Sequence, residues 1–261
     1  KPAHLKLSSG QVIILDTSQR ELLLDSELTY RDGSVIARLD QQDIVDITLE
    51  IPKGGSYYLK LQDGSEVWLN SDSKLHYPSR FIGERRVVSL EGEAYFKISE
   101  ANSSNGKRVP FFVNTNGQSI EVLGTEFNVM AYADEKVIES TLIEGAVKVH
   151  IGSVEVPLYP GQQIRNENRH ISKVNVDVDQ YLAWRTNTFN FHETKLEDAL
   201  RILSRWYDFE IQNNQSIPET HIYASISRNK SLSDVLKMME STGLHFKIIN
   251  KGNKNILIID N

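Results

Sequence analysis

Two kinds of side chain in this sequence could carry chemistry: histidines and closely spaced carboxylates. Glu91 and Glu93 stand two residues apart, and a pair of carboxylates is what glycosidic hydrolysis requires. The glycine between them predicts a turn and a poor catalytic geometry. The histidines show neither the i, i+4 spacing nor the downstream acid of a helical zinc site. They are His4, His76, His150, His170, His192, His221 and His245.

The rest of the sequence shows no motif of a known catalytic or cofactor site. The sequence has no glycine-rich phosphate loop and no nucleophile elbow, so it predicts no cofactor and no metal. Its 261 residues suggest one large or two ordinary domains. A net charge of −6 argues against a surface for nucleic acid, and the absence of cysteine excludes disulfides. No apolar run approaches the ~20 residues that cross a bilayer.

Residues 1–178 have the pattern of short strands. Between Leu59 and Ile98, apolar residues alternate with polar ones, and Asp63-Gly64 supplies a tight turn. Further turns follow roughly every eight to twelve residues. We therefore expect a mostly β region, built either as a β-solenoid-like stack or as a twisted two-sheet sandwich.

One hairpin pattern occurs twice in this region. Leu5 to Asp16 aligns with Leu59 to Asn70 when Gly10 is set against Gly64. The apolar positions of the two segments then coincide, which suggests a repetitive all-β architecture. Any two amphipathic hairpins can align in this way, so repetition and coincidence both remain open.

Helical spacing first occurs in residues 179–261. Leu196, Ala199, Leu200 and Leu203 form one apolar stripe, and Leu232, Val235, Leu236 and Met239 form another. Thr194 with Glu197, and Ser231 with Asp234, resemble capping boxes. Apolar segments flank both predicted helices, so we expect a small α+β domain of two β-α-β units.

Several segments resemble, in order, the periplasmic sensor domain of FecR-like anti-sigma factors of Bacteroidetes. They are DGSEVWLNSDSKLHYPSRF (63–81), SLEGEAYFKI (89–98), VLGTEFNV (122–129), TLIEGAVKV (141–149), LYPGQQ (158–163) and YLAWRTNTFNF (181–191). The α+β region resembles the signalling domain at the N-terminus of secretins and TonB-dependent transporters. The resemblance covers nearly the whole chain.

This resemblance implies a role in signalling across a membrane. The chain would be the periplasmic part of an inner-membrane protein, following a cytoplasmic anti-sigma segment and one membrane helix. It would bind the signalling domain of a TonB-dependent outer-membrane transporter and regulate an extracytoplasmic-function sigma factor through the cytoplasmic segment. The cargo of the transporter, a siderophore, a haem or a glycan, stays open.

The resemblance also singles out the bond between Gly124 and Thr125. Some FecR-type proteins cleave themselves at a Gly-Thr bond, by attack of the threonine hydroxyl on the preceding carbonyl carbon. A glycine before the bond leaves room for that attack. The structural alternative is that Gly124 forms a bulge and Thr125 begins a strand.

The partner surface is expected on strand edges of the α+β region. Edges invite β-augmentation, and we expect them at Phe189, Asn190 and Phe191 or at Ile256, Leu257, Ile258 and Ile259. A carbohydrate-binding or adhesin-like β protein is the alternative function. Its candidate sugar platform would be aromatic residues that also suit strand packing, namely Trp68, Tyr77, Phe81, Tyr95 and Phe96.

Overall fold

The computed structural model describes residues 1–39, 43–212, 217–240 and 243–260. The chain divides into two units with separate hydrophobic cores, Lys1–Val178 and Asp179–Asn261. The strands described in the first unit are β1 (His4–Leu7), β2 (Val12–Ile14), β3 (Glu21–Leu24), β4 (Glu27–Tyr30), β5 (Val35–Arg38), β6 (Asp46–Ile51), β7 (Tyr57–Lys60), β8 (Glu66–Leu69), β9 (Ser73–Pro78), β10 (Arg86–Ile98), β11 (Phe111–Thr115), β12 (Gln118–Val122), β13 (Thr125–Ala131), β14 (Ile138–Glu144), β15 (Val147–Ile151), β16 (Val154–Leu158), β17 (Gln162–Glu167) and β18 (His170–Asn175).

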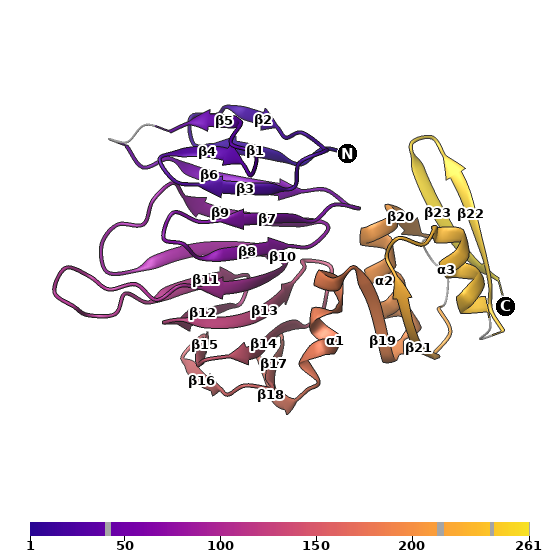
Figure 1. Ribbon diagram of the computed structural model, residues 1–261. Coiled ribbons are helices and arrows are strands. Elements are labelled where there is room, and N and C mark those ends of the chain that lie inside the picture. Colours follow the sequence, from indigo (N-terminus) through magenta and orange to yellow (C-terminus); the bar gives the residue numbers. More distant parts are fainter. Residues whose placement is uncertain (40–42, 213–216, 241–242, 261) are drawn as a thin grey trace. The chain divides into compact units, whose positions relative to one another are not determined.

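These strands form two ladders that share β10 (Figure 1). Ladder A has the order β2-β1-β6-β9-β10-β11-β12-β15-β16. Ladder B has the order β5-β4-β3-β7-β8-β10-β13-β14-β17-β18. Most neighbours pair antiparallel. The prediction of a mostly β region is confirmed, and its pairing agrees with the two-sheet alternative better than with a stack of parallel coils.

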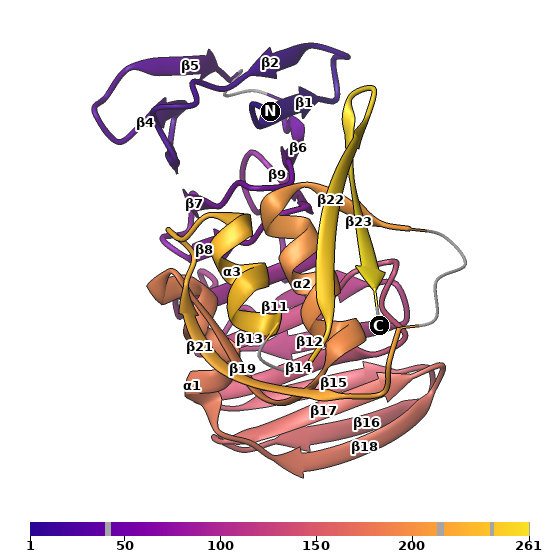
Figure 2. The same ribbon diagram turned by 90° about the vertical axis from the view of Figure 1, so that its right-hand side faces the viewer.

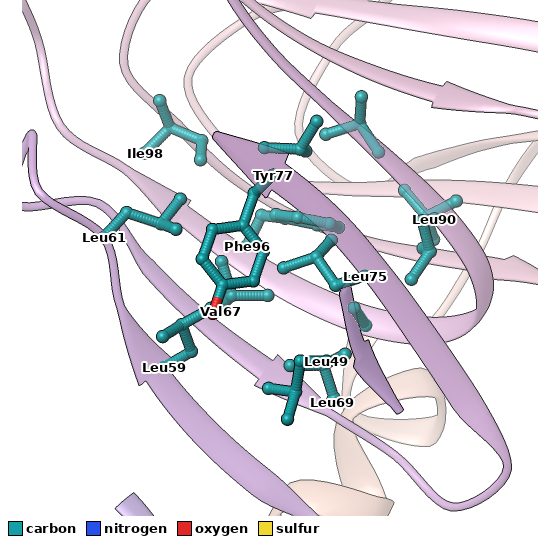
Figure 3. Close-up of a cluster of buried hydrophobic side chains, with 14 of the residues drawn as sticks. Leu49, Leu59, Leu61, Val67, Leu69, Leu75, Tyr77, Leu90, Phe96 and Ile98 are labelled. Atoms are coloured by element: carbon teal, nitrogen blue, oxygen red, sulfur yellow. The ribbon is translucent and has the colours of Figure 1, made fainter. Parts of the chain in front are cut away.

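One core lies between the ladders. Strand residues alternate between buried and exposed, as in β9, where Leu75 and Tyr77 are buried while Lys74 and His76 are exposed. Figure 3 shows Leu75 and Tyr77 of ladder A next to Phe96 of ladder B. Because the inner faces of both ladders contribute to it, the core holds the two ladders together.

Strand β10 passes from one ladder to the other at Gly92. Residues before it pair in ladder A, and residues from Gly92 to Ile98 pair in ladder B. Gly92 has φ +106°, and a Cβ there would lie 2.6 Å from the Cα of Ser73. The predicted turn at Glu91-Gly92-Glu93 is therefore wrong, because β10 continues through it as one strand. The glycine allows the backbone of β10 to lie close to that of Ser73.

The repeated hairpin is present in the structure. Leu5 pairs with Ile13 in the first copy, and Leu59 pairs with Val67 in the second, which is the register that the alignment predicts. The amide N–H of Gly10 donates to the carbonyl of Leu7 at 2.9 Å, and the corresponding bond closes the turn at Gly64. The two copies belong to different ladders, so the repetition is one of local turn chemistry.

The second unit contains α1 (Val178–Leu182), the 3₁₀ helix η1 (Ala183–Thr186), α2 (Leu196–Tyr207) and α3 (Leu232–Met239). Its strands are β19 (Thr188–Lys195), β20 (Phe209–Ile211), β21 (His221–Ser227), β22 (His245–Lys251) and β23 (Lys254–Asp260). The order β-α-β occurs twice, which confirms the small α+β region. The strands that flank each helix belong to different sheets: β19 pairs with β21, and β23 lies between β20 and β22.

The apolar stripes of both helices face one core. Leu200 and Leu203 of α2 and Val235 of α3 are fully buried there, together with Phe189 of β19 and Leu257 of β23. Figure 2 shows the β22–β23 hairpin beside α3. The predicted 3.6-residue periodicity thus identifies the buried faces of both helices.

One of the two predicted helix caps is wrong. The side chain of Ser231 accepts a hydrogen bond from the N–H of Asp234 at 3.1 Å, as expected for an N-cap. Helix α2, in contrast, begins after Lys195 without a side-chain cap. The Thr194 hydroxyl accepts from the His192 N–H, and the first N–H of the helix, that of Leu196, donates to the carbonyl of Thr220.

Candidate functional site

The Gly124–Thr125 bond lies at the start of β13, where the backbone of Gly145 packs closely against it. Thr125 is 5% exposed, and its hydroxyl donates to the carbonyl of Ala146 at 3.0 Å. Gly145 has φ +92°, and a Cβ there would lie 2.8 Å from the carbonyl oxygen of Gly124 and 2.9 Å from the Thr125 Oγ1. Gly145 therefore allows two backbone segments to meet at this bond.

Gly124 is also packed against a side chain. A Cβ at this position would lie 2.6 Å from the Cγ of Glu100, whose carboxylate pairs with Arg108 at 3.0 Å. The close packing gives Gly124 a structural role. The Thr125 hydroxyl donates to the Ala146 carbonyl oxygen, which is too weak a base to remove its proton.

The carboxylates of Glu91 and Glu93 have separate partners. Glu91 lies 3.6 Å from the ammonium group of Lys74. Glu93 accepts hydrogen bonds from the side-chain amides of Asn70 at 2.7 Å and Asn128 at 3.0 Å. Because the ladder changes at Gly92, the two acids belong to different ladders and have different surroundings, which agrees with their assignment as structural residues.

The two predicted strand edges of the second unit differ. Strand β19 pairs on one side with β21, and it has a bulge between Phe191 and Thr194. Phe189 and Phe191 are 2% and 3% exposed, so their side chains belong to the core and Asn190 is the exposed residue between them. A partner strand at this edge would meet the backbone and the exposed side chain of Asn190.

The expected edge at Ile256–Ile259 is wrong in its first half. Strand β23 is central: Ile256 and Leu257 pair with β20 on one side and with β22 on the other. Ile258 and Ile259 pair with β22 only, in the part of the sheet that the structure describes. The sequence predicts an edge at its last strand because the parallel partner β20 comes from a distant segment. The outer strand of this sheet is β22.

A cation–π cluster in the second unit is not predicted from the sequence. The guanidinium group of Arg228 lies 4.8 Å from the ring centroids of both Phe189 and Trp206. The indole N–H of Trp206 donates to the carbonyl of Arg228 at 3.1 Å. The cluster ties the end of α2 to the end of β21. No short-range sequence pattern links these three positions.

The aromatic residues of the first unit are mostly structural. Tyr77 and Phe96 are fully buried, Tyr95 is 2% exposed, and Phe81 packs edge-to-face on Phe111 at a centroid distance of 5.6 Å. Trp68 packs between Tyr58 and Tyr95, at 5.0 and 5.5 Å. The predicted sugar platform of these five residues is therefore not assembled on one surface.

The described part of the chain contains neither a cluster of metal-ligating side chains nor a helix that could cross a membrane. Within residues 1–39, 43–212, 217–240 and 243–260, no group of three or more His, Cys, Asp or Glu side chains is placed to hold a metal ion. None of the helices in these ranges has the length and apolarity to cross a membrane.

Comparison with known proteins gives the family. Residues 47–148 match the model of the FecR protein family, and residues 188–258 match the model of the FecR C-terminal domain. Together the two matches cover about two thirds of the chain. No curated protein sequence matches the chain.

Two solved structures are similar in fold and sequence. Both are crystal structures of a proposed anti-sigma factor from Parabacteroides distasonis, at 1.65 and 2.50 Å resolution. They are 30% and 29% identical to this chain, with a TM-score of 0.71 in each case. Each match covers 81% of this chain and 98% of the other. The chain therefore belongs to the FecR family of anti-sigma factors.

Proposed function

We propose that this chain is the periplasmic, signal-receiving region of a transmembrane anti-sigma factor. It binds the signalling domain of a TonB-dependent outer-membrane transporter, and this contact controls proteolysis of the full-length protein and release of an extracytoplasmic-function sigma factor. It acts as a binding module and not as an enzyme on other molecules. Membership of the FecR family supports the anti-sigma role, and the second unit supports the partner.

The observation that carries the partner proposal is the open edge of β22. This strand is seven residues long, pairs with β23 in an uninterrupted register, and has no second partner among the described strands. Regular edges of this kind accept an added strand. The bulge in β19 interrupts its ladder, and bulges protect edges from pairing. We therefore place the contact at His245–Lys251.

Proline scanning of the edge tests this contact. Alternate backbone N–H groups of β22 point away from β23. Of the variants Lys247→Pro and Ile248→Pro, one therefore removes an outward N–H group, and the other removes a hydrogen bond between β22 and β23. We expect the variant that keeps the native circular dichroism to lose affinity for the purified signalling domain at least about tenfold, or about 1.4 kcal/mol.

Asn190→Pro on β19 serves as the matched control, because it alters the competing edge. Unchanged affinity of both β22 variants, together with loss of binding in the Asn190 variant, would move the contact to β19. Unchanged affinity in all three would contradict β-augmentation through either edge.

Self-cleavage between Gly124 and Thr125 is a second proposed activity. The observation that favours it is Gly145, which brings a second chain segment against the carbonyl and hydroxyl of this bond. The Thr125 oxygen would attack the Gly124 carbonyl carbon, the C–N bond would break, and the hydroxyl proton would pass to the amide nitrogen. Water would then open the resulting ester, leaving a carboxylate on Gly124 and a hydroxyl on Thr125.

A denaturing gel tests the cleavage. Strand β13 pairs with β10 and β14, so the two pieces would stay associated in native conditions. We expect prolonged incubation of the wild type to give two fragments of similar size, Thr125→Ser to give the same fragments, and Thr125→Ala to stay intact. A wild type that remains full length would contradict this activity.

A further inference from the structure

A continuous row of side chains crosses the outer face of ladder A. In register, the row is Lys6, Thr48, His76, Ser89, Asn114, Ser119, His150 and Glu155. Their neighbours along the strands, such as Leu90, Val113 and Ile120, are buried in the core. Because successive side chains of a strand alternate between faces, the row lies on the outside.

The centre of this row is hollowed because its side chains are short. Elsewhere on this face long charged residues pair across strands, for example Lys6 with Glu50 at 2.7 Å and Lys148 with Glu155 at 3.0 Å. Ser89, Asn114 and Ser119 have short polar side chains instead. Two hollows of about 340 and about 1120 Å³ meet there, since Asn114, Ser119 and His150 line both. The smaller volume lies within the range of ligand sites.

The polar groups of the hollow are held in place by contacts within the protein. The Ser119 hydroxyl donates to Asn114 Oδ1 at 2.7 Å, which leaves the NH₂ group of Asn114 to donate elsewhere. His150 Nε2 lies 2.8 Å from a Glu121 oxygen, and His76 Nδ1 lies 3.1 Å from the Thr48 hydroxyl. A ligand would meet preoriented donors and acceptors, which lowers the entropic cost of binding.

An apolar strip lies along one side of the row. The side chains of Val87 and Phe112 line the smaller hollow with Arg85, and Val87 is 38% exposed. The Arg85 guanidinium group lies 5.2 Å from the Phe112 ring centroid. The strip offers an apolar surface beside hydrogen-bonding groups, which is the combination that recognises a ligand with one apolar and one polar side.

The charges around the hollow are balanced. The carboxylate of Glu91 pairs with Lys74, and the smaller hollow is lined by both Glu121 and Arg85. A strongly anionic or cationic ligand would therefore meet both signs of charge. Hydroxyl, amide and imidazole groups remain at the centre, and these suit a neutral ligand with many hydroxyl groups.

We propose that this hollow binds a neutral oligosaccharide. Four strand-to-strand steps separate His76 from His150, or about 19 Å at ~4.8 Å per step, which is a length for several sugar units rather than one. The sugar faces lie on the Val87–Phe112 strip, and their hydroxyls bond to Ser89, Asn114 and the two imidazoles. This activity is independent of the proposed binding of a transporter domain, because it uses the other unit of the chain.

Calorimetric titration of the whole chain with a panel of neutral oligosaccharides tests the site. The panel contains linear and branched glucans, xylans and mannans, with a polyuronate and an unrelated strand-forming peptide as arms of different chemistry. We expect saturable binding of at least one neutral member at millimolar concentration or below. Ser89→Lys and Asn114→Ala should each weaken it at least about tenfold.

Ser172→Lys is the matched control for Ser89→Lys, because Ser172 is an exposed strand residue of ladder B and the charge change is the same. It should leave the affinity unchanged, and native circular dichroism should show that all variants fold. The absence of binding to every neutral member, binding only of the polyuronate or the peptide, or equal affinity of the Ser89 and control variants would each overturn the proposal.

Discussion

The two units bury their strands against different partners. In the first unit strand faces strand, and fully buried polar residues such as Ser73 and Arg86 lie where the chain turns or changes ladder. In the second unit strands face two amphipathic helices, and the buried polar residues of its described part are Arg205 and Arg228. The first unit adds specific long-range contacts of buried polar groups to its apolar core, whereas the second depends on the apolar stripes of its two helices. Single substitutions should therefore have larger effects in the first.

The crossing at Gly92 should give the largest effect. In Gly92→Ala the new methyl group would lie 2.6 Å from the Cα of Ser73, in addition to the strain of φ +106°. We expect the first unit to lose about 4 kcal/mol of unfolding free energy, measured by urea denaturation. Gly10→Ala is the control: Gly10 has φ +85° but no atom within 4 Å of a Cβ, so only the strain of about 1–2 kcal/mol remains. Equal losses would show that the crossing contributes nothing.

The buried ion pair between Arg86 and Asp63 should come next. Arg86 Nη1 lies 2.6 Å from Asp63 Oδ2, with side chains 2% and 9% exposed. Asp63→Asn leaves a buried guanidinium group without its counter-charge, and we expect a loss of about 3 kcal/mol by thermal unfolding.

Asp32 supplies a closely matched control for this variant. Its turn has the same Asp-Gly-Ser sequence, and its carboxylate accepts from the Ser34 N–H as that of Asp63 accepts from the Ser65 N–H. Asp32→Asn makes the same change to the turn without removing the counter-charge of a buried arginine, so it should cost much less. Similar losses for both variants would assign the effect to the turn.

Glu139 should make the stability of the first unit depend on pH. Burial raises the pKa of this carboxyl from 4.5 to about 7, with Arg165 at 3.0 Å offsetting part of the shift. Because its folded pKa is raised, stability falls as the pH rises from about 4.5 through 7. Glu139→Gln should be more stable than the wild type by about 1–3 kcal/mol at pH 8 and equal to it below pH 4.5. A constant difference across this range would contradict the assignment.

The cap of α3 should give the smallest effect, in the second unit. Ser231→Ala removes the hydrogen bond to the Asp234 N–H, and we expect a loss of about 1 kcal/mol in thermal unfolding. Thr194→Ala tests the cap that the sequence predicts but the structure lacks, so it should change stability less. An equal or larger loss for Thr194 would reverse the comparison.

Local patterns predict the β-rich character of the first unit and the two long helices of the second. Asp63-Gly64 specifies its hairpin because the turn bonds join residues four or fewer apart, and the Leu196–Leu203 stripe specifies a helix face for a similar reason. The sequence predicts a turn at Gly92 because a glycine between polar residues has the same local pattern in a turn and inside a strand that changes ladders.

The sequence does not predict the contacts that form the candidate sites, because these contacts join distant segments. Ile256 is central only because β20, more than forty residues earlier, pairs with it. Ser89, Asn114, Ser119 and His150 form one row through three strand pairings, and none of these residues is unusual in its own segment. Sequence periodicity predicts which face of a strand is buried, but it does not predict which strand pairs with it.

Hydrogen exchange of the backbone amides, with and without the purified transporter signalling domain, tests the central claim most directly. We predict that the outward N–H groups of His245–Lys251 become protected on binding, while those of β19 exchange as before. Protection confined to β19, or unchanged exchange throughout the second unit in the presence of excess signalling domain, would contradict the account.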